Sequence, residues 1–400
     1  MANPLGCNGD IIRSVVDFVD GKQFLFFGLV SKDWAVAWGS RPTVTSYAAR
    51  SFSVSQLLYS FQCGLPRDQY GVCTALACLG DVQLMRCARE KGCPWHEDSC
   101  KLAARGGHLA LLRWARANGC PWNKRTCTEA ARGGHLHVLA WARENGCPWN
   151  ARTCSGAARG GHLAVLQWAR ANGCPWNERT CREAAKGGNL GLLKWARENG
   201  CPWDDGTCGG AAEGGHLAIL QWARQQGCPW DERICSVAAS KGHLNILQWA
   251  RENGCPWNFT TCKSAAIAGR LDVLQWARAN GCPWNECCCS GAAGSGHLYI
   301  LKWAREHGCR WNEWTCKDAA KGGHLDALKW ARRNGCRWNA DTCKEAAERG
   351  HLEVLQWARQ NGCPWDESTF KEAVQAGHYT LLAWARENGC PEPPFSEISS

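Results

Sequence analysis

The sequence lacks any long apolar run, because Gly, Arg and Asn interrupt every apolar patch. A helix that crosses a bilayer needs roughly 18 or more consecutive apolar residues, so we expect a soluble protein without a membrane partner. The first ten residues have neither a basic segment nor a run of small apolar residues, which argues against a signal peptide. We therefore expect a cytoplasmic or nuclear protein, in which the cysteines are thiols.

The sequence also lacks the groups of side chains on which catalysis depends. Three histidines, His96, His137 and His307, fall outside the repeated histidine position and share no neighbour that would make one of them a general base. No segment supplies paired acid and base groups. The sequence therefore predicts neither an enzyme nor a cofactor.

Three residue types are far more frequent than average: the chain has 25 Trp, 29 Cys and 44 Gly in 400 residues. Such a bias is typical of one short motif copied many times. A cysteine, usually followed by Pro-Trp or Arg-Trp, recurs every 27 residues from Cys93 to Cys390. These steps define eleven complete repeats over residues 93–389.

One repeat, residues 174–200, predicts two short helices. Thr180 and Glu183 have the spacing of a capping box, so we expect the first helix to begin at Thr180 and to end at the following Gly-Gly pair. The second helix is expected from about Leu190 to Asn199 and is apolar on more than one face. Helices this short need tertiary packing, so each repeat must stack on the next. The sequence therefore predicts an all-α repeat solenoid.

The string Ala-Ala-x-x-Gly-His-Leu occurs at residues 130–136, 157–163 and 346–352. This string resembles the core of the ankyrin repeat family. The repeat is six residues shorter than the family's usual 33, and the missing residues precede the threonine. We therefore expect a shortened hairpin turn, and the resemblance implies that the histidine bonds loop backbone.

The stack is expected to have altered ends, because terminal repeats meet water. Degenerate copies of the motif cover residues 46–92, which we interpret as N-terminal capping repeats. Residues 390–400 form a C-terminal tail, in which Glu392 stands where other repeats have Trp.

Residues 1–45 lie outside the repeat and read as a separate small helical module. The segment from Asp10 through Val-Asp-Phe-Val-Asp to Leu-Val-Ser-Lys-Asp-Trp, ending at Trp34, resembles an F-box. The resemblance implies docking on the Skp-type linker of cullin ubiquitin ligases. The docking residues would be Ile11, Ile12, Val15, Phe24, Leu25 and Trp34. The alternative is that the module only caps the solenoid with apolar surface.

A binding surface is expected where the repeats differ. The two residues before the repeated threonine vary freely, and we select Lys124, Arg125, Arg179, Arg233, Phe259 and Trp314, the two aromatics as exposed anchors for a partner. A second variable position gives a column of Arg105, Arg132, Arg159 and Lys186 on successive first helices. This column predicts a basic stripe, although solvated faces carry such charges without a function as well.

Two features that recur in most copies of the repeat have structural interpretations. Cys, Cys and His recur in each repeat, but Asn189, Arg270 and Phe370 occupy those positions in some copies. These residues cannot bind zinc as Cys or His would, so we expect core thiols and no metal. The Arg of Trp-Ala-Arg lies near a helix C-terminus, where it meets the helix dipole favourably and can stack on a Trp ring.

The sequence therefore favours a protein–protein interaction scaffold. The narrower hypothesis is a substrate receptor of a cullin-type ubiquitin ligase. The alternative is a nucleic-acid-binding helical array that uses the aligned Arg columns, which would require stacking aromatics repeated in register. The variable positions mix acids with bases, which counts against nucleic acid.

Overall fold

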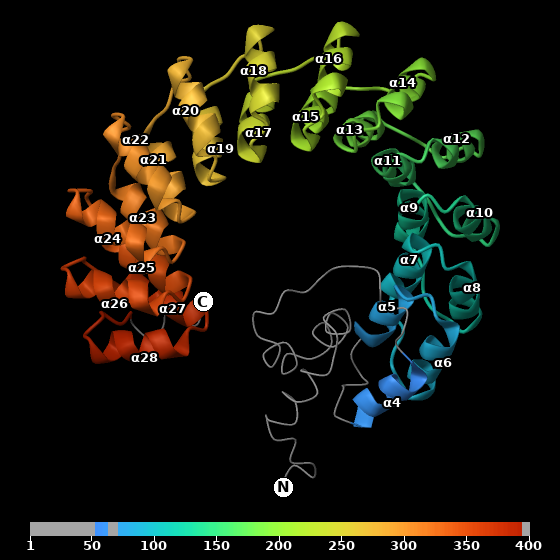
Figure 1. Cartoon of the computed structure of the whole chain (residues 1–400). Helices are drawn as coiled ribbons and strands as arrows, with labels where there is room; N and C mark the ends of the chain where they lie inside the picture. Colours follow the sequence, from blue (N-terminus) through green and yellow to red (C-terminus); the bar gives the residue numbers. More distant parts are fainter. Residues whose placement is uncertain (1–52, 63–70, 394–400) are drawn as a thin grey trace. The chain divides into compact units, whose positions relative to one another are not determined.

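The computed structural model describes residues 53–62 and 71–393, and within these ranges every regular element is a helix. The prediction of an all-α repeat solenoid is confirmed (Figure 1). None of the described helices combines the length and the apolar character that crossing a bilayer requires. The F-box-like module and its six proposed docking residues lie outside the described residues.

The chain forms two compact units, one up to Trp203 and one from Asp204 onward. The first helices of the N-terminal unit are α5 (Gly71–Ala77), α7 (Glu97–Arg105), α9 (Lys124–Arg132), α11 (Ala151–Gly160) and α13 (Glu178–Lys186). Its second helices are α4 (Val54–Gln62), α6 (Val82–Glu90), α8 (Leu109–Ala117), α10 (Leu136–Glu144), α12 (Leu163–Ala171) and α14 (Leu190–Glu198).

The C-terminal unit repeats the same order of short helices. Its first helices are α15 (Asp205–Gly214), α17 (Arg233–Lys241), α19 (Phe259–Ile267), α21 (Glu286–Gly294), α23 (Glu313–Lys321), α25 (Ala340–Glu348) and α27 (Glu367–Gln375). Its second helices are α16 (Leu217–Gln225), α18 (Leu244–Glu252), α20 (Leu271–Ala279), α22 (Leu298–Glu306), α24 (Leu325–Arg333), α26 (Leu352–Gln360) and α28 (Tyr379–Glu387).

Within each unit the helices form two layers, one of first helices and one of second helices (Figure 1). Consecutive first helices, such as α7, α9 and α11, pack directly on one another, whereas consecutive second helices touch less. The small residues of the first helices allow this close approach, because Cys181, Ala184 and Ala185 are fully buried. The turn from α10 to α11 spans only residues 145–150, without a projecting strand, as the shortened repeat predicts.

The expected start of the first helix is wrong by two residues. Helix α13 begins at Glu178 after an N-cap at Asn177, and Thr180 is buried inside its first turn. In the preceding repeat the Asn150 side chain accepts a hydrogen bond from the Arg152 amide at 3.1 Å. Asparagine caps a helix as well as threonine does, and here it comes first in the chain. The predicted second helix, by contrast, agrees with α14, which ends at Glu198.

The repeated histidine joins neighbouring repeats, as the ankyrin resemblance implies. Nε2 of His135 lies 3.0 Å from the carbonyl oxygen of Arg105, to which it donates, 30 residues earlier in the chain. The ring also fills the space above Gly107, where an added Cβ would lie 2.5 Å from the His135 ring. In the repeat that has Asn189 instead, its side-chain amide donates to the Ala158 carbonyl at 3.0 Å.

The Arg of Trp-Ala-Arg is a structural residue, as predicted. The Arg170 guanidinium lies 4.3 Å from the centroid of the Trp176 ring and donates to the Cys174 carbonyl at 2.5 Å. Trp176 in turn meets Trp195 edge to face at 6.0 Å. At the C-terminal end Glu392 replaces the tryptophan, and Arg386 binds both of its carboxylate oxygens, at 2.7 and 3.1 Å.

Candidate partner-binding surface

The two aromatic residues selected from the sequence lie exposed at the start of first helices. Phe259 is the first residue of α19 and Trp314 the second of α23, with 38% and 48% of their surfaces exposed. The Trp314 amide donates to the Asn312 side chain at 3.1 Å, so the cap fixes the backbone that presents the ring. An exposed aromatic held on a fixed backbone loses little entropy on binding, which suits an anchor residue.

Sequence reasoning missed a third apolar residue on this layer. Ile267 ends α19 and is 42% exposed. It occupies the column that holds Arg159 and Lys186 in the N-terminal unit, so an apolar residue in a charged column was the signal. The first-helix layer of the C-terminal unit therefore exposes three apolar side chains, which are candidate contacts for a partner.

In the N-terminal unit the structure brings several basic side chains together. A depression of about 210 Å³ lies over α7, α9, α11 and α13. Its cationic lining consists of Lys101, Lys124, Arg125, Arg132, Arg152 and Arg179, of which the sequence selection included all but Lys101 and Arg152. Arg152 could have been found, because it aligns with Arg125 and Arg179 at 27-residue steps. Thr128, Ser155 and Glu129 complete the lining.

The predicted basic stripe is partly neutralised by carboxylates. Glu129 lies 3.1 Å from Arg132 and 3.8 Å from Arg105, and Glu183 lies 3.0 Å from Arg159. These glutamates share one position of α9 and α13, where α11 between them has Gly156, and the column of cations alone did not reveal them. The fourth member of the column, Lys186, is the last residue of α13.

Arg233 lies at the start of α17, apart from the basic depression. Its guanidinium forms ion pairs with Asp205 and with Asp231, the latter at 2.7 Å. Two carboxylates therefore compensate this one cation. A partner that binds through Arg233 would compete with both of them.

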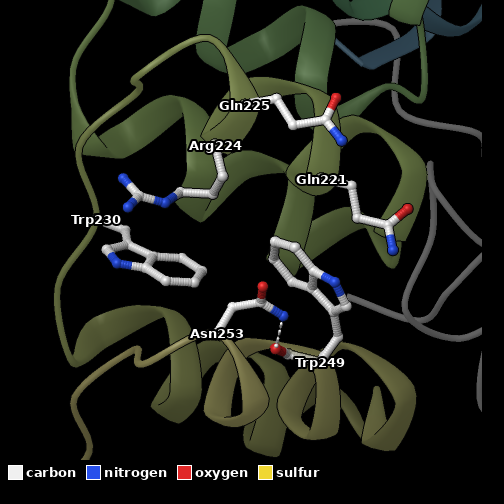
Figure 2. A pocket seen from close by; sticks show the side chains of 6 residues that line it. All are labelled: Gln221, Arg224, Gln225, Trp230, Trp249 and Asn253. Carbon is white, nitrogen blue, oxygen red and sulfur yellow. Dashed lines mark hydrogen bonds between the residues drawn. The ribbon is translucent and has the colours of Figure 1, made fainter.

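A larger depression, of about 450 Å³, lies between α16 and α18 of the C-terminal unit (Figure 2). Arg224 stacks at 4.2 Å on Trp230, Trp230 meets Trp249 at 5.8 Å, and the Asn253 amide donates to the Trp249 carbonyl at 2.8 Å. The same contacts recur around Trp176 and Trp195. This depression therefore belongs to the packing that joins second helices, and its Arg224 and Asn253 side chains are engaged within the chain.

Of the cysteines that the structure describes, every one except Cys78 and Cys287 is buried in the core. Cys174 donates through its thiol to the Asn150 carbonyl at 3.5 Å. A hydrogen bond with Cys147, together with burial, raises the pKa of the Cys127 thiol. Burial raises the pKa of Cys73 to about 12. Among the described residues, no group of three or more Cys, His, Asp or Glu side chains has an arrangement that could hold a metal ion.

Comparisons with known proteins give only distant similarities. No family model matches the sequence, and no curated protein matches it significantly. The chain is similar to the pentatricopeptide repeat protein PPR10 in complex with an 18-nt psaJ RNA element, with 14% identity and a TM-score of 0.36 over 96% of this chain and 63% of that chain. It is also similar to the human ASB11 ankyrin repeat domain, with 16% identity and a TM-score of 0.35 over 44% of this chain and 96% of that domain.

This chain therefore spans 63% of the PPR10 chain. Similarity at this level assigns neither a family nor a partner. What the sequence and the structure together establish is that the chain is a helical repeat solenoid.

Proposed function

We propose that this chain is a protein-binding scaffold of ankyrin-type repeats, in the cytoplasm or the nucleus, with its recognition surface on the first helices. The observation that carries the proposal is that uniform and variable residues of the repeat have different surroundings. The uniform residues are engaged inside the stack, as Arg170 is with Trp176 and His135 with the Arg105 carbonyl. Several variable residues at the starts of first helices are exposed, Phe259 and Trp314 among them, and others are half-buried.

The same observation counts against a nucleic-acid-binding helical array that uses the Arg columns. The repeated arginine is stacked on tryptophan and bonded to backbone, so its guanidinium is not available to phosphates. The tryptophans that recur in every repeat pack against each other edge to face, which leaves them poorly placed to stack on bases.

The test is capture of partners from cell extract by the full chain, with quantitative mass spectrometry. Phe259→Ala combined with Trp314→Ala should reduce capture of specific partners at least about tenfold, because aromatic anchors dominate interface energies. Tyr379→Ala is the matched control, because Tyr379 is 78% exposed but lies on a second helix, α28. Equal capture by both variants would contradict the proposed surface.

We further propose that the chain acts as a substrate receptor of a cullin-type ubiquitin ligase. The support is the F-box-like string that ends at Trp34. A version that lacks residues 1–45 should lose a Skp-type linker and a cullin from the captured proteins while keeping the others. If the full chain captures neither, the N-terminal segment is better explained as a cap.

A further inference from the structure

The basic depression of the N-terminal unit has the chemistry of a site for an acidic ligand. Six cationic side chains line it beside a single carboxylate, Glu129. Among the described residues, Lys124 and Arg152 have no carboxylate within ion-pair distance, and Arg125 meets Glu97 only at 3.8 Å. A concave surface with one predominant charge concentrates ligands of the opposite charge. Lys101, Arg132 and Arg179 pair with Asp98, Glu129 and Glu183 at 2.7, 3.1 and 3.7 Å. The lining cations that the fold leaves uncompensated are therefore Lys124 and Arg152, and Arg125 is only weakly paired.

Three arginines in succession distinguish this part of the solenoid. Arg125, Arg152 and Arg179 occupy one position of three successive repeats. In later repeats that position holds Gly206, Thr260 and Trp314, and the one further arginine, Arg233, is paired with Asp205 and Asp231. Packing of the stack does not require a cation there, since Gly206 and Thr260 serve equally well in helices α15 and α19. The cluster is therefore a local property of the N-terminal unit.

We infer that the depression over α7, α9, α11 and α13 binds an extended acidic segment of a protein partner, rich in Asp or Glu. This inference rests on the proposed function and names the chemistry of one partner. Three arginines on successive packed helices are spaced roughly 8–10 Å apart. A polyproline II segment presents every third side chain on one face, about 9 Å apart. Carboxylates at every third residue would thus meet successive arginines.

The lining favours a polypeptide over nucleic acid. No aromatic side chain lines the depression, so bases would find no stacking surface. Glu129, only 13% exposed at its side chain, can accept a hydrogen bond from a peptide N–H, a donor that a phosphodiester group lacks. The Thr128 and Ser155 hydroxyls, already bonded to backbone within their helices, keep lone pairs that can accept from a peptide as well.

The test is fluorescence anisotropy of the full chain with a fluorescein-labelled ten-residue glutamate peptide, beside a labelled ten-nucleotide oligouridylate. The variant is Arg125→Gln, Arg152→Gln and Arg179→Gln together. The matched control is Lys302→Gln, Arg310→Gln and Arg337→Gln, which removes the same charge from exposed positions in the C-terminal unit. Circular dichroism melts check that both variants fold.

We expect the peptide to bind, with affinity that falls as salt is raised. The depression variant should bind at least about tenfold more weakly, the sum of three modest ion pairs, and the control variant within about twofold of the native chain. Absence of peptide binding, equal loss in the two variants, or tighter binding of oligouridylate would each overturn the inference.

The two proposals fail separately in this design. A chain that captures protein partners through Phe259 and Trp314 but does not bind the glutamate peptide overturns only the acidic-segment inference. A chain that binds the peptide through the three arginines, while the aromatic substitutions leave capture unchanged, overturns only the aromatic anchor surface.

Discussion

Several residues of this repeat stabilise the contact with the neighbouring repeat rather than the helix in which they lie. Most of the repeated histidines bond to a carbonyl 30 residues earlier, as His135 does to Arg105. Some copies hold Lys241, Ala268 or Arg349 at the position of Gly187, whereas in several repeats glycine leaves room for these contacts. Gly187 is one such position, since an added Cβ would lie 2.5 Å from the Arg159 carbonyl oxygen.

Gly187→Ala should therefore lower the free energy of unfolding by about 1–3 kcal/mol, the usual range for overpacking. Gly191→Ala is the matched control in the same repeat, because it lies exposed in α14 with nothing within 4 Å of an added Cβ. That change should stabilise the protein by up to about 1 kcal/mol through helix propensity. Urea denaturation of the two variants measures both effects, and a stabilising Gly187→Ala would refute the contact.

Glu345 is a buried carboxylate whose state depends on pH. Burial alone would raise its pKa, but hydrogen bonds from Lys321 and Lys317, at 2.8 and 3.3 Å, outweigh burial and hold the pKa below its ordinary value. A lowered pKa in the folded state means that stability is fully present above about pH 4.5 and is lost as pH falls through the folded pKa.

Glu345→Gln should accordingly cost about 2 kcal/mol at pH 7, the range for a charged hydrogen bond. The difference from the native chain should shrink as the pH is lowered below about 4.5, because the native carboxylate is then protonated too. Denaturation at pH 7 and at pH 3.5 provides the comparison. A difference that stays constant would show that the ion pairs do not contribute.

At the scale of the element, the sequence predicted the second helix and the turns better than the first helix. The sequence predicts that the first helix ends at the Gly-Gly pair and that the second begins at about Leu190. Both boundaries are confirmed, because α13 ends at Lys186 and α14 begins at Leu190. Thr180 and Glu183 fit a capping box, yet Glu183 pairs with Arg159 of the preceding repeat and Thr180 is buried. Contacts between repeats therefore determine the roles of Thr180 and Glu183. The spacing of residues within one repeat gives no information about those contacts.

The asparagine that follows Cys-Pro-Trp should therefore carry the cap. Asn150→Ala should lower the free energy of unfolding by about 1 kcal/mol, because the Arg152 amide would lose its acceptor. Asn150→Asp should have little effect, as Asp366 caps α27 in the same way. Thermal unfolding of the two variants tests this, and equal melting temperatures would contradict the assigned cap.

The candidate surface was less predictable than the helices. Exposure of Phe259 and Trp314 followed from their place in the repeat, whereas the neutralisation of Arg132 and Arg159 by glutamates did not. The basic depression could not be predicted without knowing how four helices align side by side, which brings Lys101 and Arg132 into one lining. Aligning one position of the repeat shows which residues recur there, but not which residues from other positions lie beside them.

At the scale of the whole molecule, a stack of equivalent repeats should tolerate loss of one complete repeat. Removing residues 255–281 joins Gly254 to Cys282 and restores the same Gly-Cys junction. The shortened chain should keep its helix content per residue and a cooperative thermal transition. Removing residues 255–267 alone would leave an unpaired second helix and should broaden or abolish that transition. Equal behaviour of the two deletions would argue against repeat-by-repeat stacking.

The central claim is that a protein partner binds the first-helix face. The most direct measurement is site-specific photocrosslinking in cells, with a benzophenone amino acid at position 259 or 314 and, for comparison, at Tyr379 on α28. The account predicts discrete crosslinked proteins from positions 259 and 314 that are absent from position 379. Crosslinks of equal yield and identity from all three positions, or from position 379 alone, would contradict it.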